Sequence, residues 1–131
     1  MHVSFSRILV GSKWTRQELA DLWQCAAYQA IARGVVTPRD SRFIVLFVQE
    51  EKPDDFTQYD DRLAGKRLHW EGEKQHRTDS RIVNAERNQD EIHVFHRTLH
   101  RAPFTYLGRV RLVKFVHLTT DPSRAEFELI D

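Results

Sequence analysis

One run of six apolar residues restricts the possible folds of this chain more than any other feature. Residues 43–48 read FIVLFV and precede an acidic segment, residues 50–61, that contains Pro53. Continuous apolar and β-branched sequence of this length predicts a strand that is covered on both faces. The chain therefore needs packing layers on both sides of a sheet. Its 131 residues give room for one domain, spanning residues 1–131, to supply them.

A helix near the N-terminus is the second clear prediction. Thr15 and Glu18 match a capping box, in which a hydroxyl and a carboxylate satisfy free backbone N–H groups reciprocally. Apolar residues then recur at helical spacing through residue 31, and Gly34 follows as a C-terminal stop. The alanines at positions 26, 27 and 30 predict close packing of this helix on the sheet.

The remaining apolar segments predict strands, several of them short. They cover residues 3–10, 68–71, 91–97, 104–116 and 125–130, and Gly108 marks a bulge or kink in the longest one. Residues 82–86 fit either a strand or a short helix. One capped helix followed by five or six strands predicts an α+β fold. We expect a small curved β-sheet or barrel with one principal N-terminal helix packed against it.

Composition excludes several classes of protein. The longest apolar runs are about six residues, whereas a membrane helix requires roughly 18. The N-terminal residues lack the apolar segment of a signal peptide, so we expect a cytoplasmic location. The single cysteine, Cys25, excludes an internal disulfide and a cysteine-based zinc site. Motifs for a nucleophile elbow or a phosphate-binding loop are missing, and we expect neither an enzyme nor a cofactor.

The net charge of +1 conceals an asymmetry along the chain. Residues 1–61 carry seven Lys and Arg against nine Asp and Glu, whereas residues 62–124 carry thirteen against seven and six of the seven histidines. A basic middle in a near-neutral chain indicates either one surface that faces an anion or chance clustering on a solvated face. The sequence leaves both interpretations open.

The stretch from Tyr59 to Gly108 interleaves aromatic, cationic and acidic residues. An unstacked base is read by an aromatic face, by side chains that hydrogen-bond its edge, and by cations at the flanking phosphates. The stacking candidates are Tyr59 and Trp70; the edge-reading candidates are Glu71 and Asp79; the phosphate-facing candidates are Arg77, Arg81, Arg97 and Arg101. His69 is a further candidate for nucleic-acid binding. Each aromatic residue could instead belong to the core.

Two metal-dependent alternatives are weaker. His93, His96 and His100 have ligand-like spacing, but residues 93 and 96 of one strand point to opposite faces, so we expect no metal site. Asp40, Glu50 and Lys52 superficially match a nuclease pattern. A strand roughly 20 Å long would separate Asp40 from Glu50, which is too far for one metal ion.

Spaced phrases over residues 14–116 resemble known families. Residues 14–23, WTRQELADLW, and residues 28–38, YQAIARGVVTP, are similar to a segment found with HNH-type restriction endonucleases. The phrases LHWEG at 68–72, DEIHVF at 90–95 and PFTYLG at 103–108 resemble a PUA-like domain. Domains of that kind accompany such nucleases and some superfamily II helicases. No nuclease segment is present here, which implies a detached domain or a separate nuclease or helicase effector.

The resemblance implies a function as well as a fold. PUA-like relatives of the SRA, EVE and YTH types bind nucleic acid and often hold a modified base in an aromatic-lined pocket. The chain would then be a DNA-binding module that reads a methylated or hydroxymethylated base for a restriction or defence system. The alternative is a protein-interaction module that docks through the exposed side of the N-terminal helix, including Arg16, Gln17, Asp21, Gln24 and Tyr28.

Overall fold

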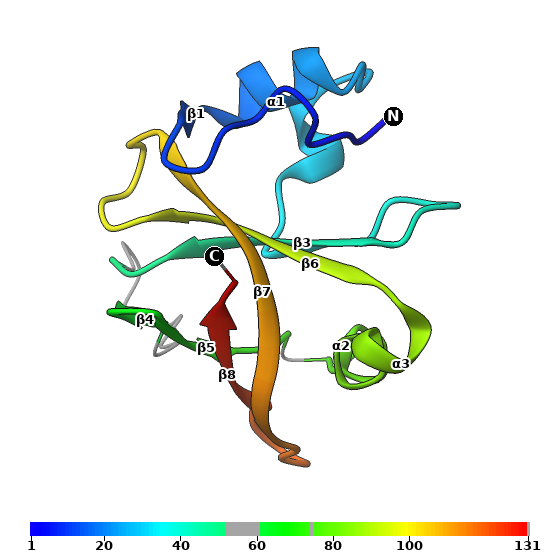
Figure 1. The fold of residues 1–131 in the computed structure, drawn as a ribbon, viewed down its shortest axis with the longest axis vertical. Coiled ribbons are helices and arrows are strands. Elements are labelled where there is room, and N and C mark those ends of the chain that lie inside the picture. The colour runs from blue at the N-terminus through cyan, green and yellow to red at the C-terminus, as the bar shows by residue number, and fades with distance from the viewer. Residues whose placement is uncertain (52–60, 74, 131) are drawn as a thin grey trace.

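Eight strands of the chain form one mixed sheet in a computed structural model, which describes residues 1–51, 61–73 and 75–130 (Figure 1). The strands are β1 (Lys13–Trp14), β2 (Val35–Val36), β3 (Phe43–Gln49), β4 (Arg62–Ala64), β5 (Arg67–Glu71), β6 (Glu91–Arg97), β7 (Phe104–Val116) and β8 (Arg124–Leu129). Their order in the sheet is β2-β3-β6-β7-β8-β5-β4, and β1 pairs separately with β7. The pair β3 and β6 is parallel, and the other pairs are antiparallel.

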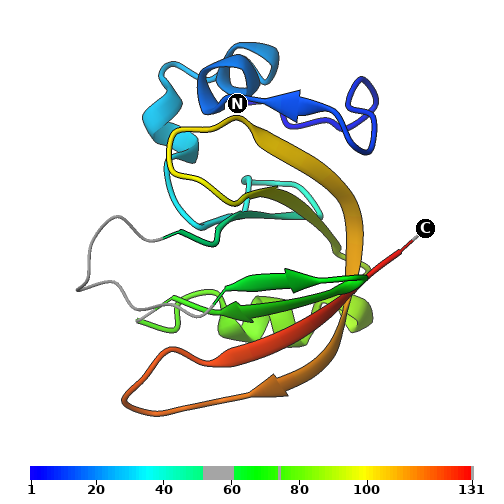
Figure 2. The ribbon, with the colours of Figure 1, turned by 90° about the vertical axis from the view of Figure 1, so that its left-hand side faces the viewer.

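The sheet is bent into a crescent, and β7 forms its back (Figure 2). This 13-residue strand pairs with β6 along its first half and with β8 along its second half. Gly108 adopts φ +92, a backbone conformation that other residues rarely adopt, opposite the register shift in β6. The curved sheet is thus confirmed, but it is not closed into a barrel. The edge strands β2 and β4 have only two and three residues, and no pairing joins them in the described part of the chain.

The run at residues 43–48 forms β3, and its buried side chains do divide between two packing layers. Ile44, Leu46 and Val48 belong to one core. Val45 and Phe47 belong to the other. The prediction of a strand covered on both faces is therefore confirmed.

Helices cover the two layers separately. The N-terminal layer holds α1 (Arg16–Leu22) and a 3₁₀ helix (Tyr28–Ile31), and it lies over one face of β3 and β6 (Figure 1). The helices α2 (Asp79–Val83) and α3 (Ala85–Asn88) lie on the other side. In the described residues no helix is long and apolar enough to cross a membrane.

The N-terminal helix is shorter than predicted. The capping box is present, with the Thr15 hydroxyl accepting from the Glu18 N–H, but α1 ends at Leu22. Trp23 is fully buried and donates its indole N–H to the Ser4 carbonyl oxygen at 3.0 Å. Gln24 then turns the chain with φ 57, so the alanines at 26, 27 and 30 are exposed and do not pack on the sheet. The helix therefore ends where Trp23 is buried and bonded to Ser4, although the helical spacing of apolar residues continues beyond it.

The predicted strand at residues 3–10 is also wrong. Phe5 and Ile8 both pack into the core of the N-terminal layer, although they are three residues apart. A strand would point them to opposite faces. Residues 82–86, which fitted a strand or a helix, belong to α2 and α3.

Candidate nucleic-acid interface

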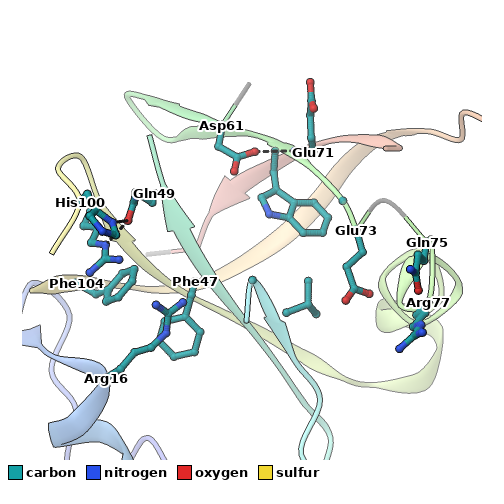
Figure 3. Close-up of a pocket in the computed structure, with 15 residues that line it drawn as sticks. Arg16, Phe47, Gln49, Asp61, Glu71, Glu73, Gln75, Arg77, His100 and Phe104 are labelled. Carbon is teal, nitrogen blue, oxygen red and sulfur yellow. Dashed lines mark hydrogen bonds between the residues drawn. The ribbon is translucent and has the colours of Figure 1, made fainter. Parts of the chain in front are cut away.

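A cavity of about 590 Å³ opens where the N-terminal layer, β3, β5 and the loop after β6 approach one another (Figure 3). Arg16 and Phe104 lie on one side of it. Glu73 and Arg77, from the segment between β5 and α2, lie on the opposite side. The volume falls in the range of about 300–1,000 Å³ that is typical of ligand sites. Elements far apart in the sequence therefore form one concave and mixed-charge site.

Two arginines share one aromatic ring on the first side of this cavity. The guanidinium carbon of Arg97 lies 4.2 Å from the Phe104 ring centre, and that of Arg16 lies 5.0 Å from the same point. Arg16 also lies 4.9 Å from the centre of the Phe47 ring and donates to the Ile31 carbonyl oxygen. Arrangements of this kind are stabilising cation–π contacts, and they hold both cations in place.

The positive charges of Arg16 and Arg97 repel each other. Burial, and secondarily the positive charge of Arg97, lower the pKa of Arg16 to about 10. Burial also lowers the pKa of Arg97. Arg97 donates to the neutral Gln49 side chain at 2.7 Å and to the Ala102 carbonyl. Among the described ion pairs, no carboxylate contacts either arginine. We refer to Arg16 and Arg97, with the Phe104 ring that both contact, as the arginine pair. This wall of the cavity is suited to bind an anion.

The opposite wall supplies hydrogen-bond acceptors. Asp61 accepts from the backbone N–H of Glu71 at 2.9 Å. Glu73 accepts from the Thr78 hydroxyl at 2.8 Å. Arg77 is exposed at the same rim. Carboxylates beside cations match a ligand that carries both donors and negative charge.

Two of the predicted residues take part in the cavity in an unexpected way. Trp70 lines the wall but is only 4% exposed, and its ring packs edge-on against Phe127 at 5.8 Å. Its stacking role stays a prediction, with most of the indole covered. The carboxylate of Glu71 points away from the cavity (Figure 3) and lies 4.0 Å from the Arg124 Nε. Edge recognition by Glu71 also stays a prediction.

Arg77 and Arg97 line the cavity as predicted residues, whereas His69, Asp79, Arg81 and Arg101 are not part of its lining. His69 contacts Glu126 at 3.5 Å and lines a second cavity of about 360 Å³. Arg81 donates to Asp90 at 3.1 Å, and Arg101 is exposed in the loop after β6. Asp79 is buried behind Gly72, where its Oδ1 would lie 3.2 Å from an added Cβ. Tyr59 lies outside the described residues.

Sequence reasoning missed several residues of the cavity, among them Asp61, Glu73 and Phe104. Two more, Arg16 and Phe47, show why. Arg16 was expected on the exposed side of the helix, yet its guanidinium turns inward onto Phe47 and Phe104. Phe47 was predicted only as a core residue of the buried strand. The basic and aromatic pattern was a usable signal, but it indicated the central stretch and not the start of α1.

The candidate metal ligands of the alternatives have separate partners. His93 contacts the Tyr106 hydroxyl at 2.6 Å, and His96 contacts the Glu50 carboxylate at 2.6 Å. Burial and the negative charge of Glu91 raise the pKa of Tyr106 to about 12. Asp40 and Glu50 lie beyond opposite ends of β3 (Phe43–Gln49), as the spacing predicted, and Lys52 lies outside the described residues. The described residues thus do not assemble the nuclease pattern.

Solved structures of other proteins have a fold similar to that of this chain. The structure of the SUVH5 SRA domain in complex with hemimethylated CG DNA is similar over 99% of this chain and 94% of that chain, with a TM-score of 0.67 and 13% identity. The same domain with fully methylated CG DNA gives a TM-score of 0.62 at 9% identity, again over 99% and 94% of the two chains. The DNA modification-dependent restriction endonuclease AspBHI is similar over 93% of this chain and 73% of that chain, with a TM-score of 0.55 and 15% identity.

The PUA-like, SRA-type fold that the sequence phrases indicated is therefore confirmed. A search against curated proteins finds no match to the sequence. A family model described as a domain of unknown function, DUF3427, matches residues 8–128. The chain belongs to the DUF3427 family.

Proposed function

We propose that the chain is a DNA-binding domain that takes one base out of the duplex into the cavity described above. The observation that carries this proposal is the arginine pair, in which two cations share the Phe104 ring without a carboxylate partner among the described residues. The single negative charge of a phosphate next to an extruded base would attract both cations. Charge-assisted hydrogen bonds from arginine to phosphate are strong and can be bidentate.

The rest of the cavity is suited to the base itself. Proteins that read an extruded base surround it with apolar or aromatic walls and hydrogen-bond its Watson–Crick edge. The wall contains Phe47, Trp70 and Phe104, and the carboxylates of Asp61 and Glu73 can accept hydrogen bonds from an exocyclic amino group. We therefore propose a base with such an amino group as the occupant, which excludes thymine.

The structural relatives support the choice of ligand. One is an SRA domain in complex with methylated CG DNA, and another is a restriction endonuclease that depends on DNA modification. A methylated or hydroxymethylated cytosine is accordingly the modified base that we propose. The role is recognition and not catalysis, and a separate nuclease or helicase effector would act on the marked DNA, in the cytoplasm.

Fluorescence anisotropy with short labelled duplexes tests the proposal. Three duplexes would differ only at one central cytosine, which is unmodified, 5-methylated or 5-hydroxymethylated, and each is titrated at two salt concentrations. We expect saturable binding at low salt with tighter binding to one modified duplex. Absence of binding to all three at low salt would overturn the proposal. Equal affinity for all three duplexes with a steep salt dependence would show that the chain binds the phosphate backbone, and would overturn the proposal that it reads a base.

A further inference from the structure

Four polar side chains from distant parts of the sequence meet behind the cavity. His76 precedes α2 and Asp79 is its first residue, whereas His117 and Ser123 flank the turn between β7 and β8. The Asp79 Oδ2 lies 2.8 Å from the His76 Nδ1 and 3.5 Å from the His117 Nδ1. The Ser123 hydroxyl donates to the same oxygen at 2.7 Å. This group, the His76 cluster, lies outside the arginine pair.

The three ionisable members can reach a common centre. One ligand atom from each of His76, Asp79 and His117 lies within 4.8 Å of the other two. Tetrahedral zinc with bonds of about 2.0–2.1 Å needs donor atoms roughly 3.4 Å apart. The 3.5 Å separation between His117 and Asp79 already meets this value. The 2.8 Å separation between His76 and Asp79 needs to lengthen by about 0.6 Å, which requires a small movement of the His76 side chain.

The burial of Asp79 calls for a nearby cation. Its side chain is 9% exposed, and its Oδ1 has no hydrogen-bond partner among the residues that the structure describes, so much of the carboxylate is withdrawn from water. A buried carboxylate is costly unless it is paired or coordinates a metal. No Lys or Arg contacts Asp79 among the described residues; the groups around Oδ2 are the two imidazoles and the Ser123 hydroxyl.

We propose that His76, Asp79 and His117 bind one divalent transition-metal ion, for which zinc is the best chemical fit. Two imidazoles and one carboxylate are a ligand set that zinc uses with a fourth, open position. His117 is the exposed ligand, with a side chain that is 58% exposed, so an ion has a route to the site from solvent. Ser123 orients the Asp79 carboxylate. This assignment replaces the expectation, drawn from the sequence, that the chain has no metal site.

The ion would connect two structural units. Residues 72–79 carry Glu73, Gln75 and Arg77 of the cavity wall, and they are joined to the β7–β8 hairpin by the Gly72 N–H, which donates to the Ser123 carbonyl oxygen at 2.8 Å. One metal ion bound by His76, Asp79 and His117 would link this wall to the hairpin and restrict its movement. The proposal is independent of DNA binding, because every group that it uses lies in the His76 cluster.

Isothermal titration of the chelator-treated chain with Zn²⁺ tests the site. We expect one equivalent to bind, and a parallel titration with Co²⁺ should give the visible absorption of a tetrahedral ion with nitrogen and oxygen ligands. The variant His117→Ala removes an exposed ligand with little risk to folding, and it should weaken Zn²⁺ binding at least tenfold. His100→Ala, which removes an exposed histidine elsewhere, is the matched control and should bind as the parent does.

Thermal unfolding supplies a second readout. Saturating Zn²⁺ should raise the unfolding temperature of the parent and of His100→Ala, since a ligand of the folded state stabilises it by mass action, but not that of His117→Ala. Absence of saturable one-to-one binding would overturn the proposal. Equal Zn²⁺ affinity in the parent and in His117→Ala would overturn it as well, and either result would leave the His76 cluster as a hydrogen-bond network.

Discussion

Replacement of one arginine of the cavity wall should separate DNA binding from stability. The variant Arg97→Gln removes a cation that the fold holds near a second cation, Arg16, on the Phe104 ring. A hydrogen bond between arginine and phosphate is worth about 1.5–3 kcal/mol, which corresponds to a roughly 10- to 150-fold loss of DNA affinity. The slope of log K against log salt concentration should fall by about 0.9 for one lost phosphate contact.

The cost to folding should be small enough for the variant to remain folded. Arg97→Gln loses the hydrogen bonds to Gln49 and Ala102, worth about 1 kcal/mol each. It also removes the repulsion from Arg16. The two guanidinium carbons lie 5.0 and 4.2 Å from one ring centre and so at most about 9 Å apart, which gives a repulsion of at least about 0.5–2 kcal/mol near a protein surface. Loss of the cation–π contact with Phe104 costs about 0.5–1 kcal/mol more. Because the relieved repulsion opposes these losses, the free energy of unfolding should fall by roughly 0.5–2.5 kcal/mol.

Anisotropy titration and urea unfolding measure the two effects on the same preparations. Arg87→Gln makes the same change of charge at an exposed position of α3 and is the matched control. Its DNA affinity should stay within about twofold of the parent value, since a distant surface charge acts only through screened electrostatics. If Arg97→Gln bound DNA as tightly as Arg87→Gln, with the same salt slope, the reasoning about the arginine pair would be refuted.

Three further predictions concern stability. The Cβ of Gly72→Ala would lie 3.2 Å from the Asp79 Oδ1 and 3.4 Å from the Trp70 ring, so urea unfolding should show a loss of about 1–2 kcal/mol; an unchanged midpoint would contradict this packing. Phe127→Ala should cost roughly 3–5 kcal/mol, because this fully buried ring packs against Trp70, and a loss below ~1 kcal/mol would refute the assignment to the core. Burial lowers the pKa of His93, so the unfolded chain takes up this proton first as the pH falls below about 6.5, and stability declines there. In His93→Gln the loss between neutral and mildly acidic pH should be smaller than in the parent, and an identical loss would exclude His93 as its source.

The strands were predictable because their signals are local. The run at 43–48 is buried continuously, and the segment at 125–130 alternates as its sequence does. The strand at 91–97 was also predictable, although residues 92–95 are all buried and do not follow an alternating pattern. The length of α1 was not predictable in this way. Its helical spacing continues past Leu22, but the buried Trp23 ends the helix through a contact with Ser4, which lies 19 residues away in the sequence.

The site was predictable only in part, for a similar reason. Trp70, Glu71, Arg77 and Arg97 come from the basic and aromatic stretch, and the structure brings all four to the cavity. Arg16 joins them because β3 and β7 place two phenylalanine rings beneath the first turn of α1.

The His76 cluster depends on the sheet in the same way. His117 meets Asp79 because the β7–β8 hairpin and the segment before α2 lie together in space. The spacing of residues in the sequence predicts neither this contact nor the contact of Arg16 with the two phenylalanine rings.

Nuclear magnetic resonance of the isotope-labelled chain with a duplex that contains one modified cytosine tests the central claim most directly. Occupation of the cavity predicts saturable shifts of the Nε–H signals of Arg16 and Arg97 and of the backbone amides of Val35 and Gly72, all of which line it. The exposed Gln17, on the outer side of α1, should change little. Saturable shifts at Gln17 with none at the four cavity residues would contradict the claim that this cavity holds the base.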